Sequence, residues 1–537
     1  MKIENNVLVK VCESDIQADR SLIIPDGIRE IGNRACSYRS FKAIHIPNSV
    51  QKIGNNAFFQ CSDLEKIDIP NSVTKIGIGA FKYCHSLKEV HLSEGIEVIE
   101  GYTFYSCSSL ECITIPDYVK VIEIGAFEYC ETLKEVHLSE GIEEIESYAF
   151  QNCPSLKSIN FPNGVQEIGN SAFYCSSLEK IDIPNTVQSI GKSAFEHCKN
   201  LKDIHLPNSI KKIEASTFAD CLSLNNVFIP DNIKTIGRHA FFQCQDLKEV
   251  YLSNNVKVID EYAFCHCTSL EKIFIQNGLE EIRSGAFINC TALREIDIPK
   301  SVKRIGKETF YKCKSLEKIS IPENVKRINN YTFYDCESLK EIHLADGIQE
   351  IDEYVFGNCT SLKVIKIPDS INMLNGTIFS NCEAIEEILW KGKVHKVQCL
   401  DSFCMNILHE KEYNGYTFYK CTYFPKSEIN YIVKNEKHLA HGETLREAMV
   451  DLEYKLSSNK DRAYHINRIA QQGYMNATDY RLLTGACKAG TDHFLKLNNL
   501  TWDDTMPVEK VLELTKNQFG FFAFEGAVKE ILSLMKH

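Results

Sequence analysis

A phenylalanine recurs along most of this chain at an almost constant spacing. Fifteen such residues, from Phe58 to Phe379, stand 23 residues apart, with a single 22-residue step between Phe173 and Phe195. The phrase LKEVHLSEGIE also occurs twice, two periods apart. A fixed period of 20–50 residues indicates a solenoid, in which each coil buries its apolar side only against its neighbours.

One period shows how such a coil is built. The unit Cys61–Phe81 reads CSDLEKIDIPNSVTKIGIGAF. Its apolar residues Ile67 and Ile69 alternate with charged residues, which predicts a short strand buried on one side. Pro70 ends that strand, because proline cannot donate a hydrogen bond to a strand ladder. Gly77 permits a tight bend before the coil closes.

The cysteines follow the same period, because fifteen of the 23 follow a periodic phenylalanine. Fourteen stand three residues after it, and Cys175 stands two after it, in the unit that is one residue short. A free cysteine behaves as a small buried hydrophobe, so we expect a reduced packing column without disulfides or metal. The members are Cys61, Cys84, Cys107, Cys130, Cys153, Cys175, Cys198, Cys221, Cys244, Cys267, Cys290, Cys313, Cys336, Cys359 and Cys382.

The repeated pattern L-x-x-I-x-I-P-x-x-V-x-x-I-G-x-x-A-F-x-x-C resembles the BspA-type leucine-rich repeat. The resemblance implies a curved solenoid with parallel strands on its concave side and a role in protein recognition. Secreted members of that family are linked to adhesion. We expect an N-terminal cap over residues 1–20, a solenoid of about 16 repeats over 21–390, and a small α+β domain over 391–537.

The outward position of each predicted strand forms one column along the concave face. Polar residues fill most of it, but Phe228, Tyr251 and Phe274 occupy three consecutive units. Clustered exposed aromatic residues are typical of binding hot spots, although cross-strand aromatic pairs can also simply stabilise a sheet. The predicted partner-binding residues are Phe228, Tyr251, Phe274, His205, Lys248, Lys272 and Asp297.

Charge and hydropathy narrow the possible partners. Residues 1–390 contain 40 Lys and Arg against 54 Asp and Glu, whereas residues 391–537 contain 20 against 18. An acidic solenoid disfavours nucleic acid, which binds to basic faces. No apolar run is long enough to cross a membrane, and the N-terminus lacks the pattern of a secretion signal. We therefore expect a cytoplasmic protein, with a surface or secreted location as the alternative.

The repeat pattern ends after Ile388, and a different architecture is expected beyond it. Strands are predicted between residues 393 and 440, followed by a helix from Thr444, which forms a capping box with Glu447. Further helices are expected over 477–497 and 507–535. Residues 431–456 weakly resemble the strand-turn-helix segment of HicB-type antitoxin domains, which implies a module that binds a partner.

Catalysis has one candidate pair in this sequence. Cys487 and His493 are the residue types of a nucleophile and its base, but six helical residues would place them about 240° apart around a helix. We therefore predict a non-enzymatic scaffold that binds a protein on its concave face, with no cofactor, metal or small-molecule substrate. A BspA-type adhesin and a cysteine-dependent enzyme are the two alternatives.

Overall fold

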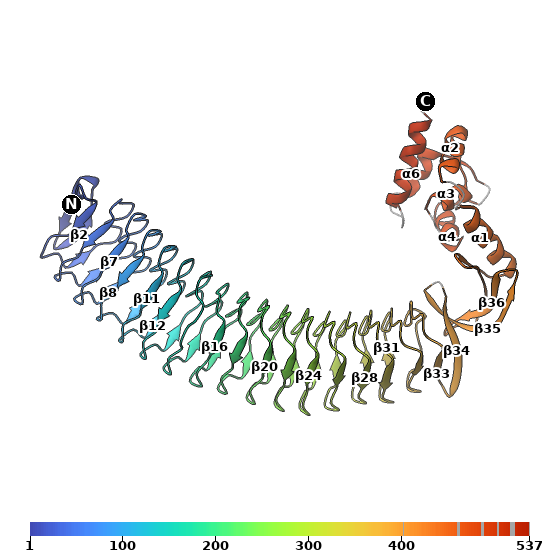
Figure 1. Ribbon diagram of the computed structural model, residues 1–537. Coiled ribbons are helices and arrows are strands. Elements are labelled where there is room, and N and C mark those ends of the chain that lie inside the picture. Colours follow the sequence, from blue (N-terminus) through green and yellow to red (C-terminus); the bar gives the residue numbers. More distant parts are fainter. Residues whose placement is uncertain (401, 459–461, 485–487, 502–503, 516–520, 536–537) are drawn as a thin grey trace. The chain divides into compact units, whose positions relative to one another are not determined.

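The structure is a computed structural model that describes residues 1–537 apart from 401, 459–461, 485–487, 502–503, 516–520 and 536–537 (Figure 1). The chain packs as two compact units, residues 1–404 and 405–537. The first unit is a curved solenoid of stacked coils, as the sequence predicts. The second combines antiparallel strands with short helices.

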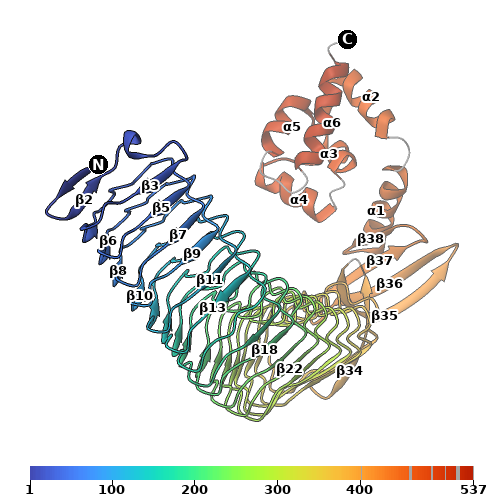
Figure 2. The ribbon, with the colours of Figure 1, turned by 60° about the vertical axis from the view of Figure 1, so that its left-hand side comes forward.

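Two parallel strand ladders run along the solenoid on different sides of the coil (Figure 2). The first ladder contains strands of three or four residues: β3 (Ser21–Ile23), β5 (Ala43–His45), β7 (Lys66–Asp68), β9 (Glu89–His91), β11 (Cys112–Thr114), β13 (Glu135–His137), β16 (Lys180–Asp182), β18 (Asp203–His205), β20 (Asn226–Phe228), β22 (Glu249–Tyr251), β24 (Lys272–Phe274), β26 (Glu295–Asp297), β28 (Lys318–Ile321), β30 (Glu341–Leu344), β32 (Val364–Lys366) and β33 (Glu387–Trp390). We call its solvent side the strand face.

The second ladder contains strands of two residues. They are β4 (Glu30–Ile31), β6 (Lys52–Ile53), β8 (Lys75–Ile76), β10 (Val98–Ile99), β12 (Val121–Ile122), β14 (Glu144–Ile145), β15 (Glu167–Ile168), β17 (Ser189–Ile190), β19 (Lys212–Ile213), β21 (Thr235–Ile236), β23 (Val258–Ile259), β25 (Glu281–Ile282), β27 (Arg304–Ile305), β29 (Arg327–Ile328) and β31 (Glu350–Ile351). Turns form the remaining side of each coil. They also form hydrogen bonds between neighbouring coils; for example, the Phe58 amide donates to the Ala80 carbonyl at 2.8 Å.

The periodic phenylalanines form one continuous stack inside the solenoid. Phe218, Phe241 and Phe264 are fully buried, and their ring centroids are 5.5 and 5.3 Å apart in sequence order. The cysteine column runs beside this stack, and every cysteine of the described chain is a free thiol. The Cys84 thiol donates to the Phe58 carbonyl at 3.2 Å, and the same contact recurs along the column. Each buried thiol therefore satisfies a buried carbonyl as well as filling space.

The coil that is one residue short corrects one detail of the predicted column. Cys175 is only half-buried, and Ser176 occupies the buried position three residues after Phe173. The Ser176 hydroxyl lies 3.1 Å from the sulfur of Cys198, the next column member. The deletion therefore falls after the column position, between Ser176 and Leu178, where the turn is shortened without breaking the stack.

Glycine is required where neighbouring coils approach closely at the end of the second ladder. A Cβ on Gly77 would lie 2.6 Å from the backbone nitrogen of Asn55 in the preceding coil. At the N-terminus, the hairpin of β1 (Lys2–Glu4) and β2 (Val7–Lys10) starts the second ladder, with the short 3-10 helix η1 (Glu13–Asp15) following it. At the other end, β34 (Lys393–Leu400) pairs antiparallel with β33.

The second unit is built on antiparallel strands. They are β35 (Phe403–Tyr413), β36 (Tyr416–Tyr423), β37 (Ile429–Lys434) and β38 (Leu439–Gly442). Helix α1 (Leu445–Ser458) packs Ala448 and Leu452 on β37 and β38. Its start is the predicted capping box, in which the Glu447 amide donates to the Thr444 hydroxyl at 3.2 Å.

The remaining helices form a separate apolar cluster of the second unit. They are α2 (Arg462–Gln472), α3 (Ala477–Thr484), α4 (Lys488–Leu497), α5 (Val508–Thr515) and α6 (Phe521–Leu534), with a small pair of strands, β39 (Tyr474–Met475) and β40 (Met506–Pro507). The sequence prediction omitted α2, whose apolar stripe consists of few residues, chiefly Ile466 and Ile469.

Candidate protein-binding surface

The strand face has the alternation that the sequence predicts. In nearly every three-residue strand the central side chain is buried and the two flanking side chains face solvent. Phe228 pairs in register with Tyr251, and Tyr251 with Phe274. The three aromatic residues therefore occupy the same outward position in consecutive coils, and Phe228 is 66 % exposed.

These three rings form a stack on the outside of the solenoid, which we call the outer stack. The ring centroids of Phe228 and Tyr251 are 4.7 Å apart, those of Tyr251 and Phe274 are 4.5 Å apart, and each pair is within 8° of parallel. The ammonium of Lys272 lies 5.0 Å from the centroid of the Phe274 ring. This distance is within the range of a cation–π contact.

The outer stack leaves specific surfaces for a ligand. The faces of Tyr251 are occupied by its two neighbours, and this explains why Tyr251 and Phe274 are only partly exposed. What remains is the outer face of Phe228, the outer face of Phe274 beside the Lys272 ammonium, and a row of three ring edges. Ring edges carry the positive part of the aromatic quadrupole, so they favour contact with apolar groups, carbonyl oxygens and carboxylates.

The other predicted binding residues surround the outer stack but differ in their surroundings. His205 lies beyond Phe228 in the column, and its Nδ1 is 2.6 Å from the Asp182 carboxylate. Lys272 pairs with Glu295 at 3.8 Å. Lys248 and Asp297 are both exposed. The Tyr251 hydroxyl donates to Glu249, and this hydrogen bond raises the pKa of the phenol.

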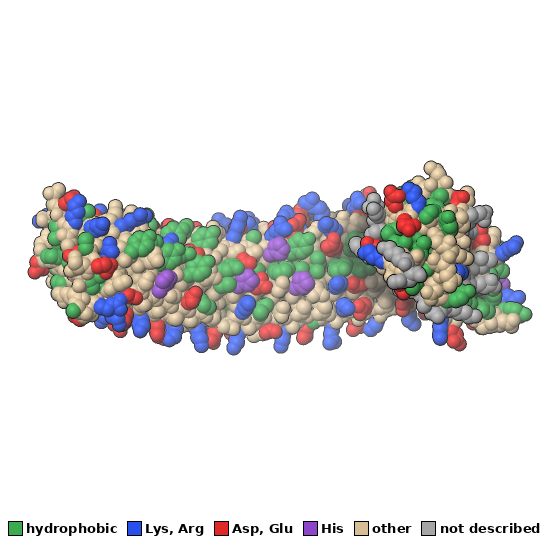
Figure 3. Space-filling view, turned by 90° about the horizontal axis from the view of Figure 1, so that it is seen from above, with side chains coloured by type: hydrophobic (Ala, Val, Ile, Leu, Met, Phe, Trp, Pro, Cys, Tyr) green, Lys and Arg blue, Asp and Glu red, His purple; other side chains and the backbone are tan. Residues whose placement is uncertain are grey.

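Exposed charges elsewhere on the strand face pair between coils as their alternating signs predict. Lys66 lies 3.1 Å from Glu89 in the next coil, and Lys134 lies 2.7 Å from Glu111 in the preceding one. Figure 3 draws one face of the molecule without identifying the ladders: charged side chains lie along both long edges of the solenoid, and hydrophobic, histidine and other uncharged side chains lie between them. Exposed pairs of this kind contribute about 0–1 kcal/mol each.

A second aromatic row lies on the turns and was missed by the sequence analysis. Its successive rings are in edge-to-face contact, with centroid distances from 5.3 to 5.5 Å. The Lys82 ammonium lies 4.1 Å from the centroid of the Tyr105 ring. The sequence does contain a pattern that indicates this row: in consecutive units, an aromatic residue follows the periodic phenylalanine by one or two places. The row contains Tyr38, Phe59, Tyr83, Tyr105 and Tyr129.

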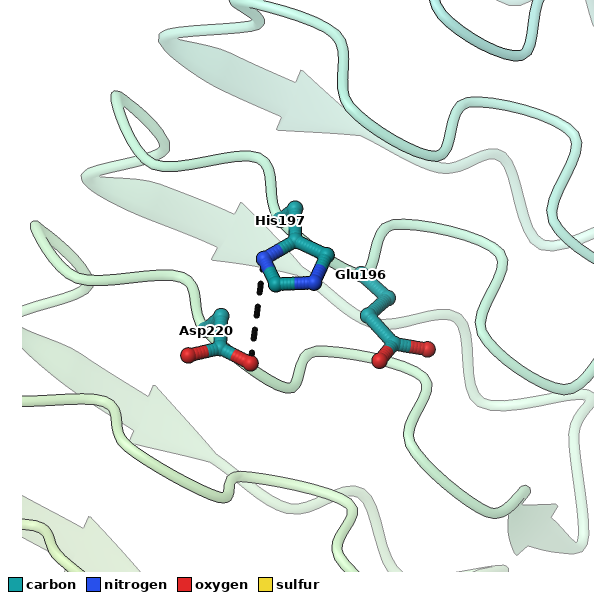
Figure 4. Close-up of side chains that lie close together, drawn as sticks. All are labelled: Glu196, His197 and Asp220. Carbon is teal, nitrogen blue, oxygen red and sulfur yellow. Dashed lines mark ion pairs between the residues drawn. The ribbon is translucent and has the colours of Figure 1, made fainter.

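One group of potential metal ligands occurs on the same turns. Glu196, His197 and Asp220 are half-buried, and their ligand atoms lie within 4.8 Å of one another. His197 Nδ1 is 3.7 Å from the Asp220 carboxylate, and the Glu196 carboxylate lies on a different side of the imidazole (Figure 4). Zinc ligands at about 2.0–2.2 Å from one ion would converge on a common point. The arrangement is instead that of an ion pair between neighbouring coils, formed when the histidine is protonated.

The repeat that builds this surface matches a known family. The model of the BspA type leucine-rich repeat region matches residues 16–133, 97–221, 188–316 and 280–407, which together span most of the chain. The chain belongs to the BspA-type leucine-rich repeat family. Its BspA-type repeats therefore account for the solenoid, and all but the first three residues of the second unit lie beyond the matched segments.

Solved structures of bacterial leucine-rich repeat proteins resemble the BspA-type solenoid. One from Bacteroides ovatus is 28% identical with a TM-score of 0.52, covering 60% of this chain and 80% of that chain. A leucine rich cell surface protein from Faecalibacterium prausnitzii is 25% identical with a TM-score of 0.38, covering 61% of this chain and 88% of that one. No curated protein matches the chain.

Two further features concern the alternatives to a binding role. Cys487, the proposed nucleophile, lies outside the described residues, and so does the side chain of His493. Within the part of the chain that the structure describes, none of the helices combines the length and apolar character needed to span a membrane.

Proposed function

We propose that this BspA-type repeat protein is a non-enzymatic scaffold that binds a protein partner on its strand face at the outer stack. One observation carries the proposal: three consecutive outward positions hold parallel stacked rings, where the column is otherwise mostly polar. Aromatic residues are enriched at the centres of protein interfaces, and truncating a residue that acts as a hot spot costs about 2 kcal/mol or more of binding free energy.

The surroundings of the outer stack fit the anatomy of a protein interface. An apolar centre is enclosed by polar side chains, with Lys248 and Lys272 on one side and His205 and Asp297 at its two ends. Such a rim excludes water from the centre and selects partners by charge. The solenoid adds a rigid frame, because every coil is fixed by backbone hydrogen bonds to its neighbours.

The test is quantitative affinity purification from the source organism with the full-length chain. Phe228→Ala combined with Tyr251→Ala should lower recovery of the specific partner by tenfold or more, while the circular dichroism spectrum stays unchanged. Asp68→Ala combined with His91→Ala is the matched control, because these residues occupy the same column several coils away. Full recovery with the aromatic double variant would show that the partner binds elsewhere.

The free cysteine column supports a cytoplasmic location as part of this proposal, because thiols persist in reducing compartments. Fractionation of source cells with thiol counting on the native protein distinguishes this location from the surface location of an adhesin. An enzymatic role through Cys487 would require that Cys487→Ser abolishes a measurable activity of the full chain. The scaffold proposal expects no such loss.

A further inference from the structure

The second unit contains a groove that is separate from the outer stack. It has a volume of about 330 Å³ and lies on the face of the β35–β37 sheet beside the first turn of α1. Phe418 and Tyr431 are half-buried at the groove, and Tyr413 and Leu445 are 63 % and 42 % exposed. This volume and apolar lining match those of sites that enclose a small ligand or a few side chains.

The polar groups of this groove are all basic or phenolic. His409, Lys411 and Lys420 line it, and no aspartate or glutamate does. Side chains alternate along a strand, so Glu410 and Glu412 of β35 point to the opposite face of the sheet. The sheet therefore separates its charges, with cations on the groove side.

Within the described part of the chain, no carboxylate compensates the two lysines of the groove. Among the described residues, ion pairs form at many exposed lysines of the solenoid, but none forms at His409, Lys411 or Lys420. His409 also pairs directly opposite Lys420 in the strand register. An anion bound at this position would therefore meet a hydrogen-bond donor on each of the two strands.

We propose that this groove binds an acidic peptide segment of a protein partner. An aromatic or branched apolar side chain of the segment enters between Phe418, Tyr431 and Leu445, and neighbouring carboxylates reach Lys411 and Lys420. Charge-assisted hydrogen bonds of this kind are about twice as strong as neutral ones. The groove is too short to follow a nucleic-acid backbone, which such proteins contact over several phosphates.

This site is independent of the proposed function of the strand face, because it lies in the other unit and shares no residue with the outer stack. Either proposal can therefore fail without the other. Its consequence for the protein is a second recognition site, with a chemistry different from that of the outer stack: a groove lined by two lysines and a histidine rather than a row of exposed aromatic rings.

The experiment selects random ten-residue peptides displayed on phage against the immobilised full-length chain. Enriched peptides should contain an excess of Asp and Glu next to an aromatic or aliphatic residue. Lys411→Glu combined with Lys420→Glu should weaken binding of the enriched peptides at least tenfold. The matched control is Lys434→Glu combined with Lys437→Glu, which makes the same charge change at exposed residues of the same unit, with Lys434 on the opposite face of the sheet.

Several outcomes would overturn the proposal. They are no enrichment, enrichment without acidic residues, equal binding to the Lys411/Lys420 variant, and equal weakening by the control variant. A ten-nucleotide oligothymidylate serves as a second probe: if it binds more tightly than the peptides and depends on the same two lysines, the occupant is nucleic acid. Thermal melting of both variants checks that the unit remains folded, and peptide binding should weaken as salt is raised.

Discussion

The stack of periodic phenylalanines inside the solenoid, here called the inner stack, and the outer stack allow one prediction in which burial is the main difference. Phe241 lies in the inner stack and is fully buried, whereas Phe228 lies in the outer stack and is 66 % exposed. Phe241 has two stacked neighbours, Phe218 at 5.5 Å and Phe264 at 5.3 Å, whereas Phe228 ends its stack and has one, Tyr251 at 4.7 Å. Replacing each by alanine therefore compares the cost of losing a buried ring with that of losing an exposed one.

The expected magnitudes follow from the buried area. A fully buried phenylalanine removes about 200 Å² from water, which at about 25 cal/mol per Å² corresponds to about 5 kcal/mol. Measured Phe→Ala costs in cores are about 3–5 kcal/mol, cavity included. We therefore expect Phe241→Ala to lower the free energy of unfolding of the solenoid by about 3–5 kcal/mol. Phe228 buries only about a third as much area, so Phe228→Ala should cost about 1–2 kcal/mol.

Urea denaturation of the full chain, followed by far-ultraviolet circular dichroism, measures both variants. The solenoid transition of Phe241→Ala should move to clearly lower urea, and that of Phe228→Ala should move little. Equal shifts would refute the reasoning, because they would mean that the outer stack stabilises the array as much as the inner one. The outer rings would then be structural, and their proposed role in binding would lose its main support.

Three further predictions concern other parts of the chain. Burial raises the pKa of the Cys61 thiol to about 12. Because the folded pKa exceeds the unfolded value, the free energy of unfolding should keep its full value below about pH 8.5 and fall by about 1.4 kcal/mol per pH unit for each buried thiol as pH rises towards 12. Urea denaturation at stepped alkaline pH measures this decrease. Arg481→Ala should destabilise the second unit by about 3 kcal/mol, the low end of the cost of breaking a buried pair, because the buried carboxylate of Asp451 loses its guanidinium partner but keeps the longer contact with Lys455 at 3.5 Å; Asp451→Leu combined with Arg481→Met should melt close to the wild-type temperature. Lys66→Ala should cost under about 1 kcal/mol in urea denaturation, because its pair with Glu89 is exposed.

The period alone predicted most of the solenoid, for a physical reason. Each coil contacts only its neighbours, so a residue such as Ile67 or Phe81 meets its own equivalents, and the pattern of one unit determines the packing of all. The short coil was harder to predict, because the location of the missing residue depends on which side chain occupies the buried position after Phe173. Ser176 occupies that position and Cys175 does not, although cysteine fills it in the other units.

The candidate sites were predicted to different degrees. The outer stack followed from register, because equivalent positions in successive coils must adjoin. The turn row of Tyr83, Tyr105 and Tyr129 was missed, because its members shift by one place relative to the period and only the turn geometry brings them together. The basic groove around Lys411 and Phe418 was not predictable, since it depends on strand pairing and on where α1 packs, neither of which repeats.

The hydrogen bonds between coils also determine how the solenoid responds to a pulling force. In both ladders and in the turns, backbone hydrogen bonds join each coil to the equivalent region of the next coil, one period along the chain. A force applied at the N-terminus would therefore detach the coils one after another. Each detached coil would release 23 residues, or about 75 Å of extended chain. The solenoid would therefore lengthen under load in equal steps of one coil. The unfolding force would be lower at any coil that lacks its buried phenylalanine.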